Sequence, residues 1–168
     1  MSNPKTNIRS NNKYCLPIVK SSKAEVLNEI KTNIDRYRYL EVWLDYVSDI
    51  DTDFASSLVA KYPHRLIMVF RRLNLDAEKI SGEQRFAILK TLARKQVLVD
   101  LDITSQIEDI KKIQAARIQI KSIISYHNYS LTPSDTELRS IVNRISGCGA
   151  HIIKIATHCA IQRDALRL

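Results

Sequence analysis

Short runs of β-branched and aromatic residues alternate along this chain with longer segments in which apolar residues recur every three or four positions. Val26, Ile30 and Ile34 show this helical spacing in the first of the longer segments. The strand-like runs are 14–19, 39–47, 65–71, 97–102, 121–126 and 151–157. Strands that alternate with helices form a parallel sheet. Because the repeat is about 25 to 28 residues long, we predict six βα units.

The length of the chain limits how complete such a fold can be. A closed (β/α)8 barrel needs about 200 residues or more, whereas this chain has 168. We therefore predict an α/β fold of the TIM-barrel type, incomplete with about six of eight units, over residues 14–168. Residues 1–13 form a flexible polar leader in this interpretation. An open barrel exposes its sheet edges. We expect that a partner covers the gap, that the sheet rearranges, or that the chain is a fragment.

Composition excludes several other classes of protein. Hydrophobic residues make up 45% of the chain, enough for a core, and three glycines and four prolines are too few for a turn-dense β-sandwich. No apolar stretch approaches the ~20 residues of a spanning helix, and the polar N-terminus does not resemble a secretory signal. We therefore expect a cytoplasmic protein without membrane association. Cys15, Cys148 and Cys159 follow no CxxC pattern, which predicts buried free thiols and no metal site.

The formal net charge of +8 suits either nucleic acid or a small anionic substrate. Lysines and arginines are scattered over the predicted helices and form no single stripe, and no nucleic-acid-binding motif is present. A basic nucleic-acid-binding domain is therefore the less favoured alternative.

Polar side chains near the carboxyl ends of the predicted strands share one parity, and therefore one face of the sheet. They are Glu41 on the second strand, Arg71 on the third, Asp100 and Asp102 on the fourth, His127 on the fifth and Lys154 on the sixth. Active sites of (β/α) barrels lie at this end of the strands. The pattern predicts that a carboxylate, an arginine, a histidine and a lysine converge there.

Lys154 stands inside an otherwise apolar strand, between Ile153 and Ile155. Desolvation would lower the pKa of its amine, and an uncharged amine can attack a ketone to form a Schiff base. The alternative is a lysine that reaches solvent at the strand end or pairs with a carboxylate. His127 has two interpretations as well, either a proton shuttle or a strand-end histidine that is simply hydrogen-bonded. Arg71 either binds a carboxylate or forms a salt bridge with a neighbour.

The amino-acid sequence of the last two predicted strands is specific enough to compare with a known family. The segment 121–133, KSIISYHNYSLTP, followed by 149–156, GAHIIKIA, resembles the paired histidine and lysine signature of type I 3-dehydroquinate dehydratase. Shorter pieces of the first four strands resemble the same family: CLPIV at 15–19, LEVWLDY at 40–46, FR at 70–71 and VDLD at 99–102. The resemblance extends from about Tyr14 to the last residue.

This resemblance implies a lyase of the shikimate pathway of aromatic amino acid and chorismate biosynthesis. It would convert 3-dehydroquinate to 3-dehydroshikimate and water, with no cofactor and no metal. By the same resemblance Lys154 forms an imine with the substrate ketone, and His127 moves the protons. Glu41 then corresponds to a ligand of a substrate hydroxyl, and Arg71 to another polar substrate contact.

The sequence also departs from the family pattern. Trp43 replaces an arginine, and Leu75 occupies the position of an acidic residue. Asn128 and His151 each replace an aspartate, beside His127 and ahead of Lys154 respectively. The family's seventh and eighth strands, which supply an arginine, a serine and a glutamine to the substrate, have no counterpart here. The alternative function is therefore a catalytically impaired remnant that acts through a homodimer or a complementing chain at the open barrel edge.

Overall fold

The computed structural model describes residues 14–70 and 80–168. The predicted leader and Arg71, together with Leu75, lie outside the described residues. The strands are β1 (Cys15–Ile18), β2 (Tyr39–Trp43), β3 (Leu66–Val69), β4 (Leu98–Asp102), β5 (Lys121–Asn128) and β6 (Ile152–Thr157). The α-helices are α1 (Lys23–Asn33), α2 (Thr52–Lys61), α3 (Gly82–Thr91), α4 (Ile107–Ala115), α5 (Asp135–Gly147) and α6 (Gln162–Ala165). One 3₁₀-helix, η1 (Leu44–Tyr46), follows β2.

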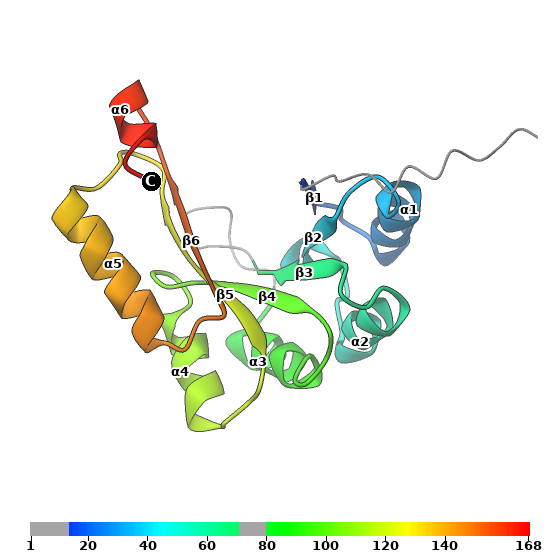
Figure 1. Cartoon of the computed structure of the whole chain (residues 1–168). Helices are drawn as coiled ribbons and strands as arrows, with labels where there is room; N and C mark the ends of the chain where they lie inside the picture. The colour runs from blue at the N-terminus through cyan, green and yellow to red at the C-terminus, as the bar shows by residue number, and fades with distance from the viewer. Residues whose placement is uncertain (1–13, 71–79) are drawn as a thin grey trace, which may run out of the picture.

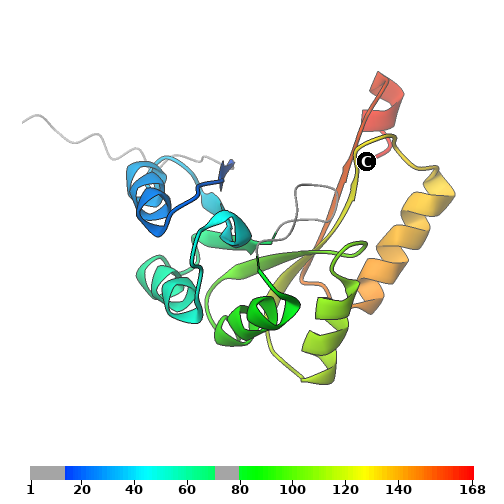
Figure 2. The same cartoon turned by 180° about the vertical axis from the view of Figure 1, so that it is seen from behind.

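The six strands form one sheet in the order β1-β2-β3-β4-β5-β6, and each neighbouring pair is parallel. Figures 1 and 2 show that the sheet curls and that α1 to α5 lie along its outer side. The arrangement is a half-barrel built from consecutive βα units. It confirms the predicted incomplete TIM-type barrel with six units.

The ends of the second and fifth strands differ from the prediction in ways that affect the site. The second strand ends at Trp43, because Leu44–Tyr46 turn into η1. The fifth strand continues past the predicted end to Asn128 and pairs with β6 as far as Thr157. The extension carries His127 within regular sheet, which fixes the face that its side chain occupies.

Side-chain caps start four of the helices. Ser22 and Ser134 each form a capping box, with Glu25 and Glu137 respectively. Asp51 and Ser81 accept hydrogen bonds from backbone amides in the first turns of α2 and α3. Such caps pair amide groups that the helix itself leaves without partners.

The turns from helix to strand use left-handed residues. Gly149, with φ of +71°, follows the end of α5, where a residue with a Cβ would be strained. His64 and Arg94 adopt similar φ values of 61° and 57° without being glycine. Their amides donate to the carbonyls of Gln96 and Gln119, so each turn is tied to the next βα unit.

The two faces of the sheet differ in chemistry. The large hydrophobic core lies on the outer face, where residues such as Val42, Met68 and Val99 pack with Ile30, Leu58 and Ile88 of the helices. The inner face holds a small apolar cluster of Ile67, Val69 and Ile123. Toward the carboxyl ends of the strands, this cluster gives way to charged side chains. The outer core holds the helices in place and leaves the inner face for polar groups.

The cysteine prediction is wrong on burial. Cys15 and Cys159 are exposed and Cys148 is partly exposed, although all three thiols are free. Cys15 lies on an edge strand and Cys159 in the turn after β6, where few neighbours cover them. No helix among the described residues is long and apolar enough to cross a membrane.

Candidate active site

Six polar side chains from four strands of the sheet meet on the inner face, toward the carboxyl ends. They are Glu41 of β2, Asp100 and Asp102 of β4, Ser125 and His127 of β5, and Lys154 of β6. The register places Ser125 beside both Asp102 and Lys154, and it places His127 beside Ala156. Because alternate residues of a strand share a face, these side chains project into the same concave space. The structure thus brings together Lys154, His127 and Glu41, as the sequence pattern predicted.

Lys154 is ion-paired. Its Nζ lies 2.8 Å from Asp100 Oδ2 and 3.7 Å from Glu41 Oε2. The Lys154 side chain is 35% exposed, whereas that of Asp100 is 1% exposed. The sequence suggested an amine shielded by apolar neighbours. Instead the isoleucines beside it occupy the other parity of β6, and two carboxylates face the ammonium group.

Asp100 links the lysine to the neighbouring strand. Its Oδ1 accepts a hydrogen bond of 2.5 Å from Ser125 Oγ, and its Oδ2 faces Lys154. Both Asp100 and Ser125 are buried. A buried carboxylate needs such partners, because burial without them is costly. The pair of contacts therefore fixes the direction in which the Lys154 amine approaches the site.

His127 forms a second buried pair. Its Nδ1 lies 2.8 Å from Asp102 Oδ2, and the two side chains are 8% and 4% exposed. Burial acts to raise the pKa of the Asp102 carboxyl, but hydrogen bonds from His127, Ser105 and Thr104 outweigh it and hold that pKa below its usual value. The Asp102 carboxylate is therefore ionised near neutral pH and accepts a hydrogen bond from the Nδ1–H group of His127. The neutral imidazole then has its lone pair on Nε2.

Glu41 is held by Trp43 of the same strand. Trp43 Nε1 donates a hydrogen bond of 2.9 Å to Glu41 Oε1, which leaves Oε2 toward Lys154. Partial desolvation and the charge of Glu41 raise the pKa of the Cys15 thiol to about 11, while Lys154 acts in the opposite direction. The electrostatic influence of this site therefore reaches the edge strand β1.

The sequence placed Asp100 and Asp102 on this face at the carboxyl end of their strand but gave neither a role, and Ser125 was not among the candidate site residues. The signal was available in part, because alternation on β4 places both aspartates on the face of His127 and Lys154. Their partners depend on the register between β4, β5 and β6, which the spacing of the runs does not give. Among the described residues, no group of three or more histidine, cysteine or acidic side chains is arranged to hold a metal ion.

A curled parallel half-barrel with a lysine and a histidine on its inner face defines a (β/α)-barrel protein with a candidate Schiff-base site. The family model of type I 3-dehydroquinase matches residues 14–168. The chain therefore belongs to the type I 3-dehydroquinase family, which confirms the resemblance seen in the sequence.

Relatives agree with this assignment, and a solved structure shares the fold. A 3-dehydroquinate dehydratase of Pyrococcus abyssi is 31% identical over 113 residues, which are 66% of this chain and 53% of that protein. One from Methanococcus maripaludis is 24% identical over 157 residues, 92% of this chain and 71% of the relative. The type I enzyme of Clostridium difficile, solved with covalently modified comenic acid, gives a TM-score of 0.74 at 24% identity over 94% of this chain and 66% of that one. The chain thus spans about half the length of the Pyrococcus relative.

Proposed function

We propose that this chain carries the chemistry of a 3-dehydroquinate dehydratase, a hydro-lyase that converts 3-dehydroquinate to 3-dehydroshikimate and water. The observation that carries the proposal is the placement of Lys154 and His127 on adjacent strands of one concave face. On β5, His127 lies two residues beyond Ser125, which is the register partner of Lys154 on β6. At ~3.3 Å per residue and ~4.8 Å between strands, their Cα atoms are about 8 Å apart, so both side chains can reach one small substrate.

The reaction begins at the lysine. Lys154 first transfers a proton to Asp100, directly or through water, and its lone pair then adds to the ketone carbon of the substrate. A proton moves from the nitrogen to the former ketone oxygen, Asp100 returns its proton to the same oxygen, and that oxygen leaves as water to give a protonated imine. The imine draws electron density from the adjacent carbon, and a base of modest strength can then remove a proton there.

His127 provides that base. Its Nε2 takes the proton from the carbon next to the imine, and the electron pair moves to the imine nitrogen to form an enamine. The enamine expels the hydroxyl group one carbon further on, and His127 returns its proton to that oxygen, so that water leaves. A second water then hydrolyses the conjugated imine, which releases the enone and restores Lys154.

The carboxylates position these two groups. Asp102 holds His127 in the tautomer that presents Nε2, and Asp100 holds the lysine on the inner face. Glu41 Oε2 is the acceptor closest to the lysine after Asp100, and we assign it to a substrate hydroxyl. Arg71, which lies outside the described residues, stays a proposed polar contact of the substrate.

Turnover tests this function. The purified chain is mixed with 3-dehydroquinate, and formation of the conjugated enone is followed by ultraviolet absorbance. We expect turnover by the unmodified chain and none by Lys154→Arg, which keeps a cation for Asp100 but has no nucleophilic amine. A chain that shows no absorbance growth over the buffer blank would support the impaired remnant instead.

We also propose that another strand pairs with β6, from a second copy of the chain or a complementing chain. Among the described residues, β6 pairs only with β5. Ile152 and Ile153 on this edge are 44% and 39% exposed. Free strand edges with apolar side chains favour association. Sedimentation of the purified chain tests this, because a monomer at all concentrations would argue against self-association.

We propose a cytoplasmic location, in keeping with three free thiols.

A further inference from the structure

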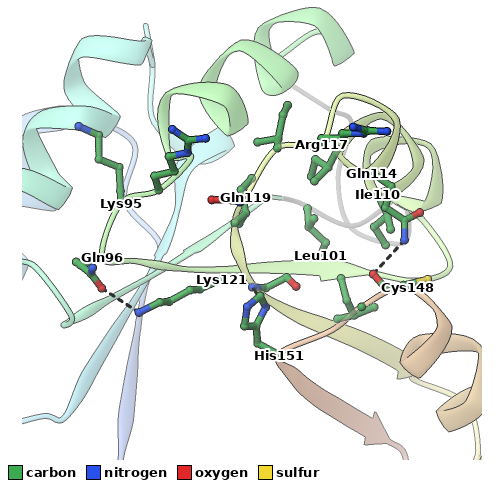
Figure 3. Close-up of a pocket in the computed structure, with 17 residues that line it drawn as sticks. Lys95, Gln96, Leu101, Ile110, Gln114, Arg117, Gln119, Lys121, Cys148 and His151 are labelled. Atoms are coloured by element: carbon green, nitrogen blue, oxygen red, sulfur yellow. Dashed lines mark hydrogen bonds between the residues drawn. The ribbon is translucent and has the colours of Figure 1, made fainter.

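A cavity of about 560 Å³ lies at the opposite end of the strands from the candidate active site (Figure 3). It opens between the turn after α3, the turn after α4 and the turn after α5, beside the first residues of β5. Its size falls within the range of sites for small molecules. The mechanism proposed above uses none of its residues.

The floor of the cavity is apolar. Leu101 of β4, Ile110 of α4 and Ile124 of β5 are buried and line it, and the partly buried Ile113 and Ile118 extend this surface. Apolar lining of this kind binds the hydrocarbon part of a ligand by removing it from water.

The rim is cationic. Among the described residues, Arg94, Lys95, Arg117 and Lys121 are the lysines and arginines that line the cavity, and this lining includes no aspartate or glutamate. Within the described part of the chain, none of these four cations forms an ion pair. Lys121 instead donates to the side chain of Gln96 at 2.9 Å. Lysines and arginines elsewhere in the fold, such as Lys154 and Arg85, do have carboxylate partners. The rim therefore holds positive charge that the protein itself does not neutralise.

Two hydrogen bonds order the wall of the cavity. Gln114 Nε2 donates to the carbonyl of Cys148 at 3.1 Å, which ties α4 to the end of α5 (Figure 3). The backbone amide of Ser122 donates to His151 Nδ1 at 3.2 Å. Because Nδ1 accepts, the neutral His151 ring carries its proton on Nε2 and adds a donor at the same wall. The site is thus held in shape from three βα units.

From these observations we propose that this cavity binds a small amphipathic anion, with its apolar body on the isoleucine and leucine floor and its carboxylate at the arginine and lysine rim. An arginine fork and a lysine ammonium are the side chains suited to a carboxylate. The cavity shares strands with the active site: Leu101 faces the cavity, while Asp100 and Asp102 on either side of it face the inner space. The site is nevertheless separate, and its occupancy can be measured without catalysis.

The test uses 2-naphthoate as the probe and its neutral amide, 2-naphthamide, as the matched ligand. Binding to the full chain is measured by calorimetry. We expect one 2-naphthoate per chain, bound at least about tenfold more tightly than the amide, because the rim contributes charge-assisted hydrogen bonds. The backbone amide signals of Ser122 and Gly149 should shift in nuclear magnetic resonance spectra, and that of Gly82 should not.

Substitutions of exposed residues test which cations of the rim bind the carboxylate of the probe. The double substitution Arg117→Gln and Lys121→Gln should weaken 2-naphthoate at least about fivefold and leave the amide unchanged. Lys112→Gln, an exposed cation on α4 outside the cavity lining, serves as the control and should bind as the unmodified chain does. Equal affinity for the acid and the amide, an equal loss in the control variant, or shifts confined to residues around His127 and Lys154 would each overturn the proposal.

Discussion

Asp102 Oδ2 and His127 Nδ1 lie 2.8 Å apart on the adjacent strands β4 and β5, and both side chains are almost fully buried. Asp102 is fixed in turn by the amides of Thr104 and Ser105, each 2.9 Å from its Oδ1. The histidine therefore has a defined tautomer and orientation before any substrate arrives. The contact with Asp102 holds the His127 imidazole in one orientation, which a solvent-exposed histidine would lack.

Asp102→Asn should lower kcat about 10²-fold or more, because an amide at this position can stabilise the wrong tautomer of His127 and no longer stabilises an imidazolium. Asp102 is a positioning residue in this account, so imine formation at Lys154 should survive. The measurement is steady-state turnover of 3-dehydroquinate, combined with trapping of the imine. Asp102→Glu, which keeps the charge, should recover part of the rate. An unchanged kcat in the asparagine variant would show that His127 works without this contact.

Acid should remove the contribution of Asp102 to stability. Its pKa in the folded chain lies below the ordinary value of 3.8, so its contribution is fully present above pH ~4 and is lost as the pH falls through the lowered pKa. At pH 7 we expect Asp102→Asn to lower the free energy of unfolding by roughly 1–3 kcal/mol. Urea unfolding at pH 7 and at pH 3 tests this. The difference in unfolding free energy between the unmodified chain and Asp102→Asn should be smaller at pH 3 than at pH 7. An equal difference at both pH values would contradict the stabilising role of the Asp102 carboxylate.

The ion pair of Lys154 with Asp100 makes a prediction about stability that is separate from catalysis. Lys154→Ala removes the cation 2.8 Å from the buried Asp100 carboxylate, and we expect a loss of about 1–2 kcal/mol, reduced by the exposure of the lysine side chain. Lys154→Arg keeps a cation near Asp100 and should lose less. Thermal and urea unfolding of the two variants give the comparison. Equal stability of the alanine and arginine variants would mean that the pair contributes nothing measurable.

Cys15 reports on the charges of the site. Its thiol has a pKa of about 11, so at pH 8 only a small fraction is thiolate and alkylation by iodoacetamide should be slow. Glu41→Gln removes a negative charge and should lower this pKa, which speeds alkylation. Lys154→Met removes a positive charge and should slow it. Peptide mass spectrometry distinguishes Cys15 from Cys159. Changes of the same sign in both variants would refute the electrostatic account.

Much of the fold could be predicted from the sequence because the βα alternation is regular. Runs such as 97–102 and 121–126 fall within two residues of β4 and β5. Strand parity was enough to place Glu41, His127 and Lys154 on one face, because side chains alternate strictly along a strand. The early end of β2 was missed, since Leu44–Tyr46 continue the alternation of apolar and polar residues that is typical of a strand.

The pairings within the site could not be predicted, because they depend on register. Shifting β4 against β5 by two residues would preserve every parity and yet move Asp102 away from His127. The exposure of Cys15 and the pairing of Lys154 with Asp100 likewise depend on neighbours that no local pattern specifies. The cavity beneath α4 is assembled from three turns that are distant in sequence, so spacing alone gives no sign of it.

Borohydride reduction tests whether Lys154 forms an imine with the substrate. The chain is incubated with 3-dehydroquinate, reduced with sodium borohydride and digested, and the peptide that contains Lys154 is weighed by mass spectrometry. We predict a stable secondary amine at Lys154, which adds the mass of the reduced, dehydrated adduct, and no adduct in Lys154→Arg. An unmodified Lys154 peptide, or an adduct on a different lysine, would contradict the account.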